Sequence, residues 1–286
     1  MIVEKAYGKI NLGLEVLGKR DDGFHELRMI MLPISTCDTL WIEEADRPSI
    51  IMNEHLGPIE DNIIYKVYFD IKKRFNIQKN ASIYVDKVLP VGAGLGGGSS
   101  DAAATLKGLI KLWGISISDE ELLTLALSYG SDVPFFLKSV PSFVTGRGEI
   151  IEPIHFPYEL TLVCHYPGYA TSTKEVFMHY QEMKHPSRIL PFLEALKVGK
   201  ALEMLRTLEN DLQKTSSDIA VQKGFIPPSS LQDIFMLKKA TTSLMSGSGS
   251  TVYGVFLEKE TAEFVLNDLK IAYPNDSIWM TTTIIA

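Results

Sequence analysis

The chain has 286 residues, a hydrophobic fraction of 45%, a charged fraction of 22% and a formal net charge of −7. Since a domain has roughly 150 residues, this length predicts two globular domains. The composition excludes a mainly disordered, collagen-like or coiled-coil protein. The negative charge disfavours a nucleic-acid-binding protein, although a small phosphorylated ligand is compatible with it, because a local pocket can be positive on an acidic molecule.

The sequence carries no signal for export, membrane insertion or disulfide cross-linking. The residues after Met1 lack the layout of a signal peptide, and no apolar run approaches the length of a membrane span. Cys37 and Cys164 match neither a disulfide framework nor a paired metal motif. We therefore expect a reduced, cytoplasmic setting, with no membrane partner.

Predicted strands and helices alternate along the N-terminal half. Alternating apolar residues predict strands that end at Gly18 or lie at 24–34, 39–43, near Ile50 and 81–89. Helical spacing predicts helices at 61–75 (with Asp61 as N-cap), 101–113, and from the capping box of Ser118 and Glu121 to Tyr129.

Two prolines, Pro153 and Pro157, indicate a boundary between domains at 1–155 and 156–286. In the second domain the same patterns predict strands at 160–165, 251–257 and 278–285. They predict helices near 174–181, 189–196, 199–207, 231–239 and 259–271.

Glycine is concentrated in one short segment, because five of the seven residues at 92–98 are glycines. Ordering so many glycines costs backbone entropy. Close approach of backbone N–H groups to an anion, with a helix N-terminus behind them, offsets that cost. The predicted order of strand, loop and helix suits this use, and Ser99 and Ser100 add hydroxyls for a phosphate or its Mg²⁺. The alternative is a flexible turn without a ligand.

Three familiar nucleotide-binding loops do not match this segment. No lysine follows the glycines, which excludes a P-loop. The Gly-x-Gly-x-x-Gly spacing of a Rossmann loop is present, but Asp86 and Lys87 interrupt the preceding strand, which should be almost entirely apolar. The Val-Ala-Ile-Lys strand and His-Arg-Asp loop of protein kinases are both missing.

Residues 90–103 resemble the phosphate loop of the GHMP kinases, whose hallmark is Pro-x3-Gly-Leu-Gly-Ser-Ser-Ala-Ala. Further similar segments follow the family order at 9–14 with 22–27, at 130–135 and at 245–254. The resemblance implies a two-domain α+β fold, with an N-terminal domain like ribosomal protein S5 domain 2 and a C-terminal ferredoxin-like α/β sandwich. It also implies transfer of a phosphoryl group from ATP, with Mg²⁺, to a hydroxyl of a small molecule.

The same resemblance assigns residues to the nucleotide. The residues expected to bind ATP are Pro90, Val91, Gly92, Ala93, Gly94, Leu95, Gly96, Gly97, Gly98, Ser99 and Ser100. The sequence does not identify the protein ligands of Mg²⁺, and Ser100 is only a candidate.

Asp132 matches the catalytic aspartate of the family and would accept or orient the proton of the acceptor hydroxyl. Because Val133 precedes Pro134, we expect extended backbone there. The alternative for Asp132 taken alone is a residue of a surface turn.

Lys9 matches the catalytic lysine, which would keep the aspartate ionised. By alternation alone, Lys9 lies on the polar face of its strand and is expected to be exposed to solvent. Asn11 points to the same side and could hydrogen-bond the substrate.

The family branch that this chain resembles most binds a cytidine diphosphate acceptor. In that branch a histidine at the position of His25 contacts the cytosine edge, and aromatic rings at the positions of Phe24 and Phe177 stack on the base. Gly247 and Gly249 would let a third motif, residues 245–254, approach the phosphate loop. Without a ligand, His25 would be structural, Phe177 part of a helix core, and the two glycines part of a hairpin.

The chain departs from the family pattern at three places. Tyr7 and Gly8 stand where Pro-Ala is usual, Phe24 replaces a tyrosine, and Ser250 replaces a proline. None of these departures removes Lys9, Asp132 or the glycine segment, but Tyr7 and Phe24 flank the expected substrate pocket and so concern the acceptor. The resemblance implies a small cytidine diphosphate compound as acceptor. The alternatives are another hydroxyl acceptor, of the mevalonate or sugar-alcohol type, and a ligand sensor without turnover. The sequence leaves open whether the protein is a monomer or a homodimer.

Overall fold

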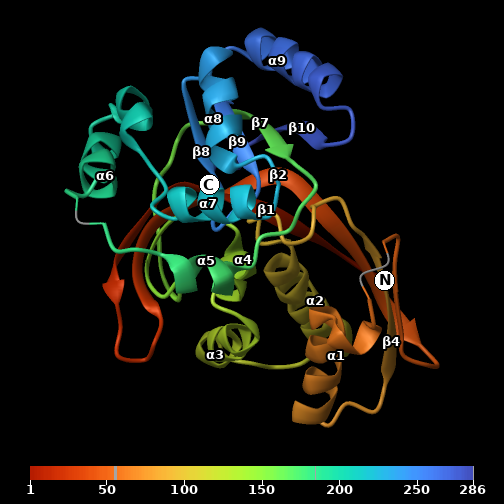
Figure 1. The fold of residues 1–286 in the computed structure, drawn as a ribbon. Coiled ribbons are helices and arrows are strands. Elements are labelled where there is room, and N and C mark those ends of the chain that lie inside the picture. The colour runs from red at the N-terminus through yellow and green to blue at the C-terminus, as the bar shows by residue number, and fades with distance from the viewer. Residues whose placement is uncertain (55–56, 184, 286) are drawn as a thin grey trace. The chain divides into compact units, whose positions relative to one another are not determined.

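The computed structural model describes residues 1–54, 57–183 and 185–285. Within it the chain forms two compact units, each built from separate stretches of sequence. The first unit contains Met1–Gly8, Thr36–Pro90 and Gly96–Ser139. The second contains Lys9–Ser35, Val91–Leu95 and Val140–Ala286. Figure 1 follows the chain through its elements.

The strands are β1 (Ile2–Lys19), β2 (His25–Ala45), β3 (Ser49–Met52), β4 (Asn80–Asp86), β5 (Ser142–Gly146), β6 (Ile150–Pro153), β7 (Thr161–Tyr166), β8 (Thr242–Met245), β9 (Val252–Phe256) and β10 (Ser277–Thr282). The α-helices are α1 (Ile63–Arg74), α2 (Gly97–Trp113), α3 (Asp119–Tyr129), α4 (Val133–Lys138), α5 (Thr173–His179), α6 (Ile189–Lys197), α7 (Gln213–Gln222), α8 (Pro228–Leu237) and α9 (Lys259–Ala272). Two 3₁₀ segments, Ile59–Asp61 and Ala201–Thr207, complete the described elements. No helix among the described residues is both long and apolar enough to cross a lipid bilayer.

In the first unit, helices cover one face of a sheet. Residues 39–45 of β2 pair antiparallel with β4, and β3 pairs parallel with β4. Helices α1 and α2 lie side by side (Figure 1). At Gly108 of α2 an added Cβ would lie 2.3 Å from Cδ1 of Ile42, so the helix approaches β2 as closely as glycine allows. This contact fixes the position of α2, which carries the end of the glycine segment.

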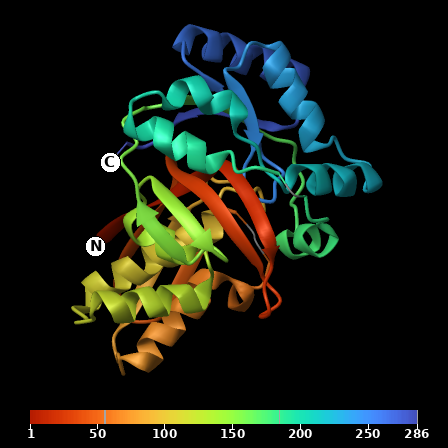
Figure 2. The same ribbon diagram turned by 90° about the vertical axis from the view of Figure 1, so that its left-hand side faces the viewer.

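In the second unit, an antiparallel sheet has the strand order β10-β7-β9-β8. Helix α8 packs on β8 and β9, and α9 packs on β7, β9 and β10 (Figure 2). Phe235 of α8 is fully buried against Gly254 of β9, where an added Cβ would lie 2.6 Å from the ring. Burial of such a side chain contributes roughly 1.5–3 kcal/mol. Residues 27–31 of β2 pair with β5, which pairs with β6.

Several predicted elements are confirmed, and the differences have local causes. The capping box of Ser118 and Glu121 starts α3 as predicted. The two strands predicted at 24–34 and 39–43 are parts of one strand, because residues 35–38 between them are also extended. Asn62, not Asp61, caps α1: its side chain accepts a hydrogen bond from the Ile64 amide, while Asp61 ends a 3₁₀ turn.

In the C-terminal half, the segment predicted as a helix at 199–207 is a 3₁₀ helix. Helix α7 and the short strands β5, β6 and β8 were not predicted. The sequence of α7, Gln-Lys-Thr-Ser-Ser-Asp-Ile-Ala-Val-Gln, has little apolar periodicity, and β8 has only 4 residues. Such segments depend on tertiary packing rather than on local pattern.

Candidate functional site

Lys9 and Asn11 lie in β1 and are buried, with 4% and 1% of their surfaces exposed. The expectation that their face of the strand is exposed is therefore wrong, because alternation shows only that one face differs in polarity from the other. Lys9 Nζ donates to Asn11 Oδ1 at 2.6 Å, and Asn11 Nδ2 lies 3.1 Å from the Met29 sulfur. A buried ammonium needs such partners. The pair is thus held in a defined orientation.

Three segments that are distant in sequence meet in the second unit. The Lys9 amide donates to the Leu95 carbonyl at 2.9 Å, and the Thr251 amide donates to the Ala93 carbonyl at 3.2 Å. The hydroxyl of Ser246 donates to the Gly94 carbonyl at 2.8 Å. The strand of Lys9, residues 91–95 of the glycine segment and the third motif are therefore one hydrogen-bonded cluster.

Glycine is required where these segments touch. Gly94 has a φ of +79°, and a Cβ added there would lie 2.1 Å from the Ser246 carbonyl oxygen. Gly247 has a φ of +56°, and its Cβ would lie 3.1 Å from Lys9 Nζ and 3.2 Å from the Gly94 carbonyl oxygen. A larger residue at either position would force the backbones apart. Gly249, with a φ of +88°, packs instead against Met245.

Sequence reasoning missed Asn210, which holds the third motif from the other side. Its Nδ2 donates to the carbonyls of Met245 and Gly247, each at 2.8 Å. Asn210 is buried, with 5% of its surface exposed. A lone asparagine between a 3₁₀ segment and a helix has no pattern of its own, so no local signal could have identified it.

His25 and Phe177 come together in the second unit. Their rings stack with centroids 5.0 Å apart and an interplanar angle of 23°, and Tyr180 meets His25 edge-on at 6.0 Å. Partial burial, and then the charge of Lys19, lowers the pKa of His25. The neutral imidazole therefore dominates at pH 7, with one donor and one acceptor nitrogen. That combination suits the edge of a base.

Phe24 is half exposed, at 50%. The guanidinium of Arg147 lies 5.0 Å from its ring centroid, a cation–π contact that the sequence did not predict. Arg147 belongs to the turn between β5 and β6, so the contact joins two hairpins of the second unit. One face of the Phe24 ring is thus occupied by this cation.

The first unit contains the other end of the glycine segment. Gly96 adopts the left-handed conformation, with a φ of 71°, and α2 begins at Gly97. The first amides of a helix have no partner within it and carry partial positive charge, which makes this end suitable for a phosphate. Ser100, in the first turns, is buried, with 2% of its surface exposed.

Asp132 lies in the first unit, between α3 and α4. It is half-buried and is the N-cap residue of α4, but its side chain makes no capping hydrogen bond. The predicted extended backbone at Val133 is wrong, because Val133 and Pro134 begin α4. Proline is tolerated there because the first amides of a helix have no partner to lose. Ser99 is close to this loop: a Cβ added at Gly130 would lie 3.9 Å from its hydroxyl.

Throughout the part of the chain that the structure describes, no three His, Cys, Asp or Glu side chains are grouped as a metal site. Mg²⁺ in kinases usually keeps several waters and binds substrate phosphates with few protein ligands. A hydroxyl at the start of α2 fits that chemistry.

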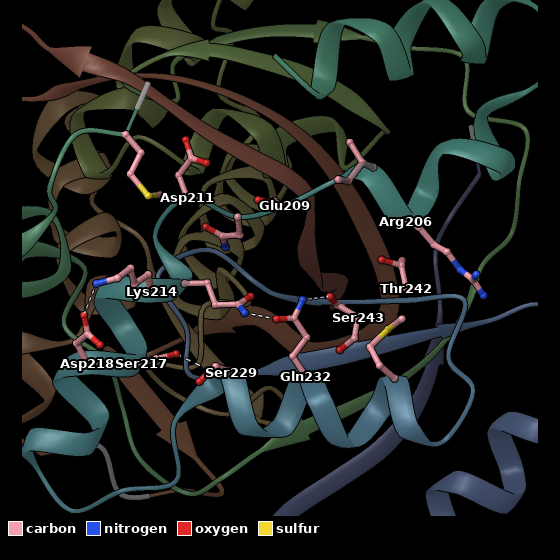
Figure 3. Close-up of a pocket in the computed structure, with 15 residues that line it drawn as sticks. Arg206, Glu209, Asp211, Lys214, Ser217, Asp218, Ser229, Gln232, Thr242 and Ser243 are labelled. Carbon is pink, nitrogen blue, oxygen red and sulfur yellow. Dashed lines mark hydrogen bonds and ion pairs between the residues drawn. The ribbon is translucent and has the colours of Figure 1, made fainter. Parts of the chain in front are cut away.

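A separate pocket of about 520 Å³ opens in the second unit (Figure 3). In its lining, the Gln213 side chain donates to the Gln232 side chain, which donates to the backbone carbonyl of Ser243. Every charged side chain in its lining has a partner, as in the Lys214–Asp218 pair at 3.1 Å. The described lining includes none of the residues predicted from the sequence.

Comparison with known proteins gives consistent matches over nearly the whole chain. The family models "GHMP kinases N terminal domain" and "GHMP kinases C terminal" match residues 62–139 and 193–275. The chain is 37% identical over 272 residues to the 4-diphosphocytidyl-2-C-methyl-D-erythritol kinase of Thermoanaerobacter pseudethanolicus, covering 94% of this chain and 92% of that protein. It is 38% identical over 277 residues to the protein of the same name from Caldanaerobacter subterraneus subsp. tengcongensis, covering 94% and 93%. A crystal structure of 4-(cytidine 5'-diphospho)-2C-methyl-D-erythritol kinase superposes with a TM-score of 0.82, at 28% identity and 99% coverage of both chains.

Proposed function

Since this chain belongs to the GHMP kinases, we propose that it transfers the γ-phosphoryl group of ATP to the 2-hydroxyl of 4-diphosphocytidyl-2-C-methyl-D-erythritol. This reaction belongs to the non-mevalonate synthesis of isoprenoid precursors. The observation that carries the proposal is 37–38% identity, over 94% of the chain, to relatives of that name. The expected two-domain α+β GHMP kinase fold is confirmed.

ATP would bind along the glycine segment. The backbone amides of residues 92–100 and the N-terminus of α2 would hold its phosphates, because the overall charge of −7 gives no attraction for them. Mg²⁺, with Ser100 as a protein ligand, would neutralise charge on the transferred group. Phosphoryl transfer depends mainly on positioning and charge stabilisation, which this arrangement supplies.

Lys9 and Asp132 would be the catalytic pair. Asp132 would accept or orient the proton of the acceptor hydroxyl, and its unused capping position leaves the carboxylate available. Lys9 would favour the ionised carboxylate. Asn11 would orient Lys9 through their 2.6 Å hydrogen bond and contact the substrate.

The cytosine base would be held by the aromatic cluster of the second unit. The neutral His25 would hydrogen-bond the base edge, while Phe177 and Phe24 would stack on the base. Gly247 and Gly249 would line the acceptor beside Lys9. The proposal includes a division into domains at 1–155 and 156–286. It also includes a cytoplasmic location. Cys37 and Cys164 are both free thiols.

An ADP-release assay of the pure protein tests the proposal. The cytidine substrate, mevalonate, homoserine and galactose are supplied in parallel with Mg²⁺ and ATP. We expect release only with the cytidine substrate. Release with another acceptor would instead support a diverged GHMP kinase, and ATP binding without release would support a ligand sensor.

Replacing His25 with alanine tests the recognition of the base. We expect His25→Ala to raise the KM for the cytidine substrate about tenfold, the scale of one or two lost base contacts, and to leave the KM for ATP within about twofold. His179→Ala is the matched control, because His179 is exposed on the helix of Phe177 and bonds only locally to the Glu175 carbonyl. Equal effects of His25→Ala on both KM values would remove His25 from base recognition.

A further inference from the structure

A cluster of three buried charged residues lies beside the phosphate loop in the first unit. The cluster consists of Lys87, Asp38 and Asp101, whose side chains are 2%, 0% and 6% exposed. Lys87 Nζ donates to Asp38 Oδ2, and it donates to Asp101 Oδ2 at 2.7 Å. The proposed reaction uses none of these three side chains.

Asp38 fixes the backbone that enters the loop. This residue lies in β2, and its Oδ1 accepts hydrogen bonds from the amides of Val88 at 2.6 Å and Leu89 at 2.8 Å. Those amides directly precede Pro90, the first residue of the loop. The carboxylate therefore holds the chain where it leaves β4.

Asp101 fixes the helix that follows the loop. It is the fifth residue of α2, whose first residue is Gly97. A Cβ added at Gly97 would lie 3.3 Å from the Leu89 Cβ and 3.6 Å from Lys87 Nζ. The start of α2 is therefore in direct contact with the segment that enters the loop.

A buried charge cluster is a costly way to hold two segments together. Replacing such ion pairs with packed apolar residues is often neutral or stabilising. Here two carboxylates share one ammonium, and Asp101 Oδ1 is buried without a hydrogen-bond partner. These costs indicate a role in geometry rather than in stability.

We propose that Lys87, Asp38 and Asp101 form a clamp that holds the two ends of the phosphate loop at a fixed separation and so positions its amides for ATP. The three are positioning residues, since they act through the loop. The inference rests on the proposed function for the identity of the ligand. The clamp requires the affinity for ATP to depend on the hydrogen bond from Lys87 to Asp101.

The test measures the dissociation constant for MgATP by calorimetry, without an acceptor. Asp101→Ala removes the acceptor of the Lys87 hydrogen bond, and we expect it to weaken ATP binding about tenfold. Asp101→Asn keeps an acceptor oxygen and should restore affinity to within about threefold of the wild type. Glu4→Ala is the matched control, because Glu4 of β1 is buried and pairs with Lys111 at 2.5 Å and Lys107 at 3.7 Å, both farther along α2 than Asp101. This control should change affinity by less than about twofold, since the two lost pairs are away from the loop and affect stability only.

Equal changes of affinity in Asp101→Ala and Glu4→Ala would overturn the clamp, because both would then reflect general loosening of α2. If Asp101→Ala does not fold, amide hydrogen exchange of the wild type without ATP decides the question. The amides of Val88 and Leu89 should exchange slowly, and fast exchange would overturn the clamp. These measurements need no acceptor substrate. The clamp can therefore be tested even if the ADP-release assay shows no reaction with the cytidine substrate.

Discussion

Several polar residues of this kinase are buried rather than exposed to solvent. Lys9 and Asn11 lie on the polar face of β1, and that face is buried. Lys87 extends the alternation of β4 and is buried with two carboxylates. The alternation in sequence separates the two faces of a strand, but it cannot tell whether the polar face meets water or other polar groups.

Asp101 makes stability depend on pH in an unusual direction. Its pKa is raised from 3.8 to about 7, so between these values the folded chain holds a proton that the unfolded chain releases. The contribution of Asp101 to stability is therefore full below about pH 4 and is lost as the pH rises through 7. We expect the melting temperature of Asp101→Asn, relative to the wild type, to rise between pH 5 and pH 8. Parallel curves for the two proteins would show that Asp101 stays ionised in the fold.

At the scale of elements, Glu15 of β1 anchors the start of α6. The N-cap residue of α6, Arg188, provides no side-chain cap. Instead, Glu15 Oε1 accepts hydrogen bonds from the amides of Arg188 at 2.6 Å and Ile189 at 2.9 Å. Ser187 and Arg28 also donate to this carboxylate, each at 3.0 Å. A side chain from a strand that is distant in sequence thus accepts the hydrogen bonds that an N-cap residue would accept.

Replacing Glu15 with glutamine should lower the free energy of unfolding by about 1–3 kcal/mol, because buried amides lose a charged acceptor. Urea denaturation measures the change. Glu194→Gln is the control, since Glu194 lies exposed on α6 in a pair with Lys197, and we expect it to cost less than about 0.5 kcal/mol. A loss of similar size in both variants would contradict the anchoring role.

Periodicity identified the elements whose own sequence carries enough information. Helix α1 has four buried residues at helical spacing, and α3 begins with a complete capping box. Helix α7 and strand β8 were missed, since α7 is polar and β8 is short. The contacts of these two elements, rather than their propensities, decide their conformation.

At the scale of the whole molecule, the chain belongs to an ATP-dependent kinase family, and the proposed role of Asp132 predicts that turnover can be lost without loss of ATP binding. We expect Asp132→Asn to lower kcat by at least about 100-fold, the usual contribution of a general base, and to leave ATP affinity unchanged within about twofold. Asp119→Asn is the control, because Asp119 starts α3 as an exposed residue. An Asp132→Asn variant with near wild-type turnover would show that another group activates the acceptor.

The sequence by itself determined the family and predicted the phosphate loop. A backbone that must approach an anion or another backbone needs glycine at fixed positions, and this need leaves a local pattern, as at Gly94 and Gly247. Only the tertiary structure decided which polar groups are buried together. Asp38 and Lys87 are 49 residues apart, and Lys87 and Asp101 are 14 apart. Pairing over such separations is set by the packing of β2, β4 and α2, and it has no signature in any short stretch of sequence.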